Sequence, residues 1–379
     1  MGLNRLRQPS VILIAGCIAA GALAGLPPLP GGARPPAVLN HTAETAPLTV
    51  ETVEIPPLGP DVFPPGVNPL TGLPAPQPDY LTQPPVLAKI SNAPPLVRPQ
   101  AGIGAADLVF EHYAEGGLTR FSAIFHGQRP ARVGSIRSAR LIDYELMPMY
   151  QSILAFSGAS AGVEDRLNTS EFADRLFKGV LFGLPYFWRD DTIAMPHNMF
   201  ASAAALTQLA VDRGVAAPPD LRGMAFDSAP PPGAAGPAAR AEVAYIATRA
   251  QWTYDAATGR YFRSADGLGH YDATTLEQIS AANVVILYAD HTFTDIVESQ
   301  WQGSVSYSIE IRLWFEGDAV LLRDGQQYVA RWVRPTREAL IGLHTPAGDL
   351  LPLRPGNTWF QVMRPPQQQT PGEEWVLIE

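Results

Sequence analysis

Five arginines and one histidine lie close together in the segment from Gly117 to Arg140. Guanidinium groups bind phosphate and carboxylate through paired hydrogen bonds, and Gly134 beside them lets the backbone approach a ligand closely. An apolar run over residues 121–125 predicts a buried strand, and turn-forming residues at 127–130 end it. The polar residues should then emerge together at the carboxyl end of a strand, where α/β sheets bind ligands. The segment therefore predicts an anion site built from Arg120, His126, Arg137 and Arg140.

A structural interpretation of the same arginines competes with this one. The region supplies acidic residues in similar number, and buried ion-pair networks are common in proteins. The carboxylates that would pair with the arginines are Asp107, Glu111, Glu115, Asp143 and Glu145. Arg137 and Arg140 are three residues apart, so they share one face if a helix begins there, which favours joint binding of one ligand.

A second polar loop covers residues 189–198 and lies between the apolar pairs Phe187-Trp188 and Met199-Phe200. Its His197 is a candidate general base or a hydrogen-bond donor to an anion. Asn198 would orient His197 or cap the following helix. The simpler alternative is capping by Asn198 with a partly buried His197.

Other chemistries find less support in the sequence. The histidines show no HxH or HxxxH spacing, the only cysteine is Cys17, and we predict neither a metal site nor a cofactor. There is no G-x-S-x-G nucleophile motif. The net charge of −9 disfavours nucleic acid as a partner. Whether the protein is an enzyme stays open; a transferase or hydrolase of phospho-glycans would use His197 as its base.

The N-terminus has the pattern of an export signal. Arg5 and Arg7 precede an apolar run over residues 11–26. Three fates are consistent with it: lipidation of Cys17, cleavage after Ala24, or retention as a membrane anchor. All three place the rest of the chain outside the cytoplasmic membrane and make that membrane a partner.

The chain of 379 residues, with 46% hydrophobic content, has enough apolar material for two domains. Residues 1–26 are the export segment, and proline-rich residues 27–66 predict an extended spacer. An α/β or α+β domain with a mostly buried sheet is expected over residues 67–225. A linker at 226–237 separates it from a smaller β-rich domain over 238–379.

Apolar periodicity locates the expected elements. Strands are expected at 86–90, 108–113, 121–126 and 153–156, and helices at 139–150, 163–177 and 201–211. In the C-terminal part, Thr258-Gly259 and Asp324-Gly325 predict tight turns of hairpins.

Several short motifs together resemble the YerB-like family of bacterial envelope lipoproteins. The motifs are Asn68-Pro69-Leu70-Thr71-Gly72, Ala106 to Glu111, Glu115 to Phe121, Val133 to Arg140 and Pro196-His197-Asn198, with Gly259 to Arg263 and Pro355 to Trp359 in the C-terminal part. The resemblance covers residues 68–376 and implies an N-terminal domain of unknown function with its own C-terminal companion, attached to the membrane from outside. It brings no established activity. The function expected from the residues is binding of an anionic or glycan ligand of the cell envelope; the alternatives are an envelope enzyme or a structural and assembly protein.

Overall fold

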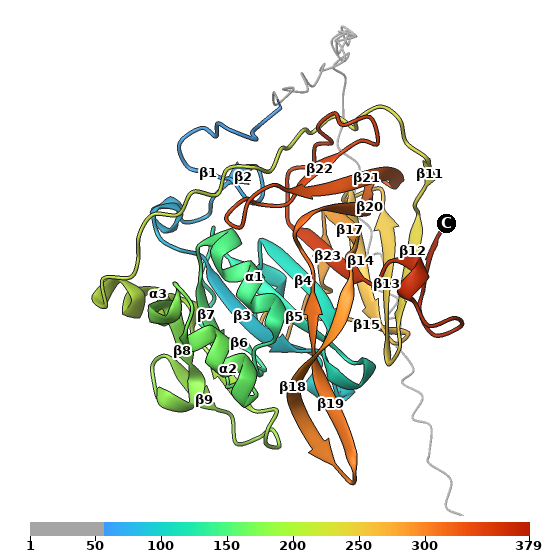
Figure 1. The fold of residues 1–379 in the computed structure, drawn as a ribbon. Coiled ribbons are helices and arrows are strands. Elements are labelled where there is room, and N and C mark those ends of the chain that lie inside the picture. Colours follow the sequence, from blue (N-terminus) through green and yellow to red (C-terminus); the bar gives the residue numbers. More distant parts are fainter. Residues whose placement is uncertain (1–56) are drawn as a thin grey trace, which may run out of the picture. The chain divides into compact units, whose positions relative to one another are not determined.

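The structure, a computed structural model, describes residues 57–379 (Figure 1). Cys17, the cleavage position after Ala24 and the anchor segment lie outside these residues. A large mixed sheet organises the described chain, in the strand order β11-β21-β20-β17-β23-β4-β5-β3-β7-β8, with β22 paired to β21. Its strands are β3 (Val86–Ser91), β4 (Leu108–Tyr113), β5 (Thr119–Phe125), β7 (Ile153–Phe156), β8 (Leu176–Lys178), β11 (Gly236–Pro237), β17 (Asn283–Tyr288), β20 (Phe315–Arg323), β21 (Gln326–Arg334), β22 (Gly342–His344) and β23 (Thr358–Met363).

Smaller sheets and three α-helices complete the fold. A six-stranded sheet contains β12 (Arg240–Tyr245), β13 (Thr248–Asp255), β14 (Arg260–Ala265), β15 (Leu268–Gly269), β16 (Ser280–Ala281) and β24 (Trp375–Ile378). The others are β1 (Val67–Asn68) with β2 (Leu73–Pro74), β6 (Val133–Gly134) with β10 (Met199–Ala201) and β9 (Phe187–Arg189), and the hairpin β18 (His291–Trp301) with β19 (Ser304–Ile311). The helices are α1 (Leu141–Tyr150), α2 (Ala161–Asn168) and α3 (Ala203–Asp212), and among the described residues none is long and apolar enough to cross a membrane.

Short 3-10 helices occupy several connections. They are η1 (Pro78–Thr82), η2 (Pro95–Val97), η3 (Ile103–Ala105), η4 (Glu115–Gly117), η5 (Ala173–Arg175), η6 (Gly179–Leu181) and η7 (Pro366–Gln368). Two of them bear on the site: η4 joins β4 to β5, and η6 follows β8.

The centre of the large sheet is buried on both faces. Every residue of β3, β4 and β5 is buried, which explains why these segments are near-continuous apolar runs in the sequence. β3 is parallel to β7 and β7 is parallel to β8, whereas β5 runs antiparallel between β4 and β3. The expected fold class is confirmed: an N-terminal part with helices and a buried mixed sheet, and a C-terminal part built almost entirely of strands.

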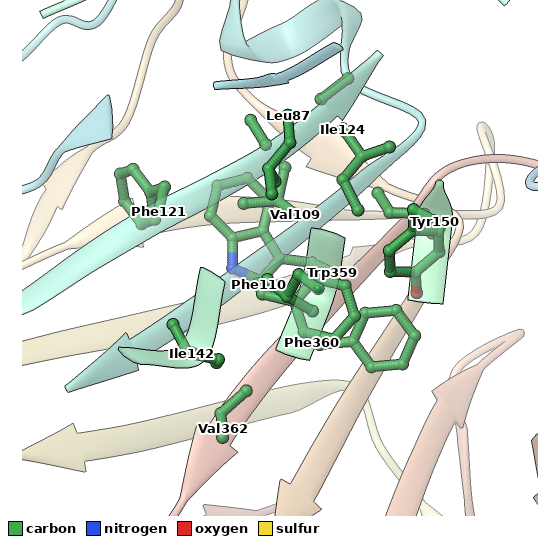
Figure 2. Close-up of a cluster of buried hydrophobic side chains, with 14 of the residues drawn as sticks. Leu87, Val109, Phe110, Phe121, Ile124, Ile142, Tyr150, Trp359, Phe360 and Val362 are labelled. Atoms are coloured by element: carbon green, nitrogen blue, oxygen red, sulfur yellow. The ribbon is translucent and has the colours of Figure 1, made fainter. Parts of the chain in front are cut away.

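One core joins the two parts of the chain (Figure 2). Phe110 of β4 stacks on Phe360 of β23 with ring centroids 4.4 Å apart, and β4 and β23 are neighbouring parallel strands. Trp359 lies edge-on to both Phe121 and Trp252, at 5.2 and 5.3 Å. The large sheet therefore continues from the N-terminal into the C-terminal part, a pairing that the sequence analysis did not predict.

The helix expected over residues 163–177 is shorter in the structure. α2 ends at Asn168, and a strand, β8, occupies 176–178. The hydroxyls of Thr169 and Ser170 donate to the carbonyls of Asp165 and Leu167, at 2.8 and 2.6 Å. Such local bonds compete with continued helix and favour its end.

The expected hairpin turn at Asp324-Gly325 is confirmed. Arg323 and Gln326 face each other in the β20–β21 ladder, so the loop has two residues. Asp324 and Gly325 have φ values of 54° and 71°, the left-handed conformation that a tight hairpin turn requires.

Residues at the C-terminal end of the expected spacer and at the start of the expected linker pack on the folded part. Leu58 and Phe63 belong to the expected spacer, yet the Leu58 N–H donates to the Phe226 carbonyl at 2.8 Å and the Phe63 ring lies edge-on to Phe226. Phe226, at the start of the expected linker, is fully buried. Apolar residues draw these ends of the segments onto the core, and residues 228–235 are the exposed stretch between the two parts.

The shared sheet leads to a prediction for limited proteolysis. Cleavage within the exposed residues 228–235 should leave the two fragments associated, because β4 and β23 stay paired in one sheet and bury a common core. The cut should appear as two bands on a denaturing gel and as one peak, at the size of the uncut protein, in gel filtration. Elution of the fragments as two separate species would contradict the continuous sheet.

Candidate functional site

The arginine cluster lies at one edge of the large sheet. β3, β4, β7 and β8 are connected so that their carboxyl ends meet there, and Arg120 at the start of β5 faces Ser91 at the end of β3. Residues 134–140 run along this edge. The Arg137 N–H donates to the Lys89 carbonyl and the Arg137 carbonyl accepts from the Ser157 N–H, both at 2.9 Å. Arg137 is therefore fixed between β3 and the loop after β7.

Arg120 and Arg140 are engaged by one carboxylate. Glu115 of η4 accepts from Arg120 Nη2 at 3.0 Å and from Arg140 Nε at 2.7 Å, and Arg140 Nη2 also contacts it. Both arginine side chains are mostly buried. Although burial alone raises the pKa of Glu115, the two guanidiniums lower it to about 2. For Arg120 and Arg140 the structure thus supports the ion-pair interpretation.

Further groups hold Arg140 in place. It precedes α1, and Asp143 of the first turn of α1 accepts its N–H at 2.8 Å. Glu298, from the β18–β19 hairpin, lies 3.7 Å from Arg140 Nη2. The remaining carboxylates that the sequence offered have other partners: Asp143 pairs with Lys89 at 2.7 Å and Glu111 with Arg263 at 2.8 Å.

Arg137 differs from its two neighbours. Within residues 57–379 no carboxylate oxygen lies within 4 Å of its guanidinium. Its Nη1 donates to the Pro196 carbonyl at 3.2 Å, and its buried Nε has no hydrogen-bond partner in this part of the chain. Burial lowers the pKa of Arg137, and the positive charge of Arg140 lowers it further. A half-buried cation beside other cations is a place where an anion is stabilised.

The loop that carries His197 reaches the same edge. It connects β9 to β10, and the Pro196 carbonyl that Arg137 contacts precedes His197. His197 Nδ1 is buried without a hydrogen-bond partner among the described residues. Burial and then the charge of Arg137 lower the pKa of His197, which favours the neutral imidazole.

Asn198 closes that loop. Its Oδ1 accepts from Arg189 Nη1 at 2.7 Å, and its carbonyl accepts from the Asp190 N–H at 2.8 Å. It is buried and does not cap α3, because Ser202 accepts the Ala205 N–H at 3.2 Å and is the N-cap. Its role in the structure is to hold His197 in position.

His126 is not part of the cluster, contrary to the expectation from the sequence. It follows the carboxyl end of β5, whereas Arg120 begins that strand. Six residues of extended chain separate the two by about 20 Å. β5 runs antiparallel to β3 and β4, so its carboxyl end lies at the opposite edge of the sheet. There His126 is buried, and Asp107 accepts its N–H.

Some groups near Arg137 were not predicted from the sequence. Ser160 is the N-cap of α2, yet its Oγ makes no cap bond and is buried without a partner among the described residues. Lys178 lies near Gly158, in the same loop, and pairs with Glu164. Residues 157–160 form the turn between β7 and α2, and the small residues there, between a buried strand and a helix, were the sequence signal for it. Within residues 57–379 no three His, Cys, Asp or Glu side chains are arranged to hold a metal ion.

A histidine titration tests the link between Arg137 and His197. Replacing Arg137 with Ala should raise the pKa of His197, because it removes the nearby positive charge that disfavours the imidazolium. Bound phosphate should raise this pKa in the unmodified protein for the converse reason. Ring-proton chemical shifts followed against pH measure it, with His344, a partly exposed histidine of β22, as the internal reference. An unchanged pKa of His197 in the variant would show that the charge of Arg137 does not act on His197.

The fold and the site define the class of protein: its chain has two parts that share one mixed sheet, and arginines gather at one end of the strands. Family models described as the N-terminal and C-terminal domains of a protein of unknown function, DUF3048, match residues 70–216 and 241–360. The chain belongs to this family. The expected linker falls between the two matched regions.

The chain is similar to one named protein in sequence and to one crystal structure in fold. The chain is 30% identical to a Bacillus subtilis (strain 168) protein named "Putative lipoprotein YerB", over 78% of this chain and 85% of that protein. The crystal structure of YerB from Bacillus subtilis is similar, with a TM-score of 0.65 and 27% identity, over 82% of this chain and 99% of the crystallised one. The resemblance seen in the motifs is thereby confirmed.

Proposed function

We propose that this protein binds an anionic component of the bacterial cell envelope at the sheet edge, with Arg137 as the residue that contacts the anion. The observation that carries the proposal is the difference among three neighbouring arginines. Arg120 and Arg140 share Glu115, whereas Arg137 has no carboxylate within 4 Å in residues 57–379. A guanidinium in this state can give two parallel hydrogen bonds to a phosphate or carboxylate.

The charge of the neighbourhood supports an anion. Burial lowers the pKa of Arg120 to about 9, and Arg140 and Arg137 act in the same direction, while Glu115 opposes them. Arg120 stays charged at pH 7, and the positive potential of the cluster exceeds what Glu115 neutralises. His197, whose lowered pKa favours the neutral ring and whose Nδ1 has no partner within residues 57–379, is a hydrogen-bonding group for the same ligand.

The envelope location is part of the proposal and rests on the N-terminus. Arg5 and Arg7, the apolar run over residues 11–26 and Cys17 form an export pattern. The Bacillus subtilis relative is named a lipoprotein. Mass spectrometry of the mature N-terminus decides among diacylglyceryl-Cys17, a free Gly25 and an intact Met1. Recovery of the intact protein from the soluble cytoplasm would defeat all three fates.

Equilibrium binding of inorganic phosphate tests the anion site. Arg137→Ala should weaken phosphate binding roughly tenfold or more, because it removes charge-assisted hydrogen bonds worth ~1.5–3 kcal/mol. Isothermal titration at constant ionic strength measures the effect, and Arg331→Ala is the control, since Arg331 lies in an exposed ion pair with Glu316. Equal phosphate affinity in the two variants would reject Arg137 as the anion-binding residue.

A further inference from the structure

An apolar surface adjoins Arg137. Four large apolar side chains are exposed on the loop after β8 and at the tip of the loop before β10: Val180 (55%), Leu181 (73%), Leu184 (78%) and Met195 (70%). Val180 and Leu184 also line a hollow of about 400 Å³, whose other apolar walls are Phe182, Phe187, Trp188 and Met199. Large apolar side chains gathered on a protein surface mark a site of interaction.

The chain joins this surface to the anion site. Met195 precedes Pro196, whose carbonyl accepts from Arg137 Nη1 at 3.2 Å. The Met199 carbonyl accepts from the N–H of Ile136, the residue before Arg137, at 2.7 Å. Met199 also packs against Gly179, which begins η6 and leads into the apolar loop. A ligand held at Arg137 therefore has apolar side chains beside it.

We propose that the ligand is a phosphate-bearing membrane lipid. Its phosphate binds Arg137, and its apolar chain lies on the surface of Val180, Leu181, Leu184 and Met195. The inference rests on the proposed function, because it uses the same anion site. Free phosphate or a soluble acidic sugar would leave the apolar side chains exposed to water, whereas an acyl chain would bury them.

Charge complementarity favours a lipid surface over an apolar protein segment. Arg189 lines the hollow, and within residues 57–379 no carboxylate oxygen lies within 4 Å of its guanidinium, whereas Lys178, which precedes the apolar loop, pairs with Glu164. Cationic groups that flank exposed apolar residues match an interface in which anionic headgroups cover acyl chains. An apolar peptide would gain nothing from the cations.

A chain-length series tests the inference while keeping the headgroup constant. The probes are inorganic phosphate and ethyl, butyl and hexyl phosphate, titrated into residues 57–379. This part is suitable because it forms one compact unit with a common core, and the crystallised YerB chain aligns to it over 99% of its own length. Affinity should rise up to about fourfold per methylene, since a fully buried methylene contributes ~0.8 kcal/mol.

Variants separate the two halves of the site. Leu181→Ser with Leu184→Ser should flatten the series and leave the affinity for inorganic phosphate unchanged, whereas Arg137→Ala should weaken every member by a similar factor. Leu268→Ser is the matched control, because Leu268 is 75% exposed on β15, in the six-stranded sheet. Vesicles of equal phosphatidylglycerol and phosphatidylcholine should co-sediment the protein, and vesicles of phosphatidylcholine alone should not.

The outcomes distinguish this inference from the proposed function. Three results would contradict a lipid ligand but not the anion site. They are hexyl phosphate that binds no better than inorganic phosphate, an equally flattened series in Leu268→Ser, and no co-sedimentation with phosphatidylglycerol vesicles. Failure of every probe, inorganic phosphate included, would overturn the proposed function itself.

Discussion

Replacing Arg263 with Met should lower the melting temperature of residues 57–379 by about 5 °C. Arg263 of β14 reaches from the six-stranded sheet to Glu111 of β4 in the large sheet, at 2.8 Å, and neither side chain is exposed to solvent. Loss of the guanidinium would leave a buried carboxylate without its charge partner, which costs ~3–5 kcal/mol. With an unfolding entropy of about 2.1 cal/mol/K per residue and about 320 residues unfolding together, each kcal/mol shifts the melting temperature by about 1.5 °C. Calorimetry or urea denaturation measures the change.

Water should not stabilise the unpaired Glu111 carboxylate in this variant, because the group lies in a buried network. Asn92 Nδ2, Thr119 Oγ1 and Gln361 Nε2 donate to its carboxylate at 3.0, 3.1 and 3.2 Å, in a buried network. The double change Arg263→Met with Glu111→Gln should recover part of the loss, because it removes the stranded charge.

An exposed pair of the same type provides the control for Arg263. Arg331 and Glu316 are 2.8 Å apart with side chains 41% and 55% exposed, so Arg331→Met should cost less than about 1 kcal/mol. Equal costs for Arg263→Met and Arg331→Met would contradict the buried link between the two sheets.

Arg140→Ala and Arg137→Ala should separate stability from binding. Arg140 is buried and holds Glu115 through two contacts, so its loss should cost about 3 kcal/mol of unfolding free energy. Arg137 contacts one carbonyl, and its loss should cost less than about 1 kcal/mol. Thermal unfolding without phosphate measures both. A melting temperature depressed as far in Arg137→Ala as in Arg140→Ala would assign Arg137 to the ion-pair network.

Acid unfolding gives a second measure of the Glu115 pairing. Arg120 and Arg140 lower the pKa of Glu115 to about 2, against the desolvation that raises it. The stability contributed by this pairing is therefore fully present above the ordinary glutamate pKa and is lost as the pH falls toward 2. In Arg140→Ala the pKa of Glu115 should rise, so the loss should begin at a higher pH.

The sequence predicted the parts of the fold that depend on local pattern. The runs at 86–90 and 108–113 are β3 and β4, and Asp324-Gly325 is the two-residue turn. Periodicity identifies buried strands, and turn chemistry identifies hairpins. Local pattern could not predict the pairing of β4 with β23. It joins strands that are far apart in the chain and depends on packing such as that of Phe110 on Phe360.

The candidate site shows the same limit. The motif around Arg120, Arg137 and Arg140 did indicate a cluster at a sheet edge, and these residues do come together. His126 was wrongly included because the sequence does not give the direction of β5 relative to its neighbours. The partner Glu115 was one of several acidic residues nearby, and its position in η4 explains why it binds two arginines and leaves Arg137 without a carboxylate among the described residues.

The most direct test of the anion site is the position of a bound oxyanion in a crystal. Tungstate has the tetrahedral oxyanion geometry of phosphate, and its heavy metal atom gives a strong anomalous signal. Crystals of residues 57–379 soaked in tungstate should show an anomalous peak within hydrogen-bonding distance of the Arg137 guanidinium, next to His197, and crystals of Arg137→Ala should lack it. A peak elsewhere with none at Arg137, or a peak that persists in Arg137→Ala, would contradict the account.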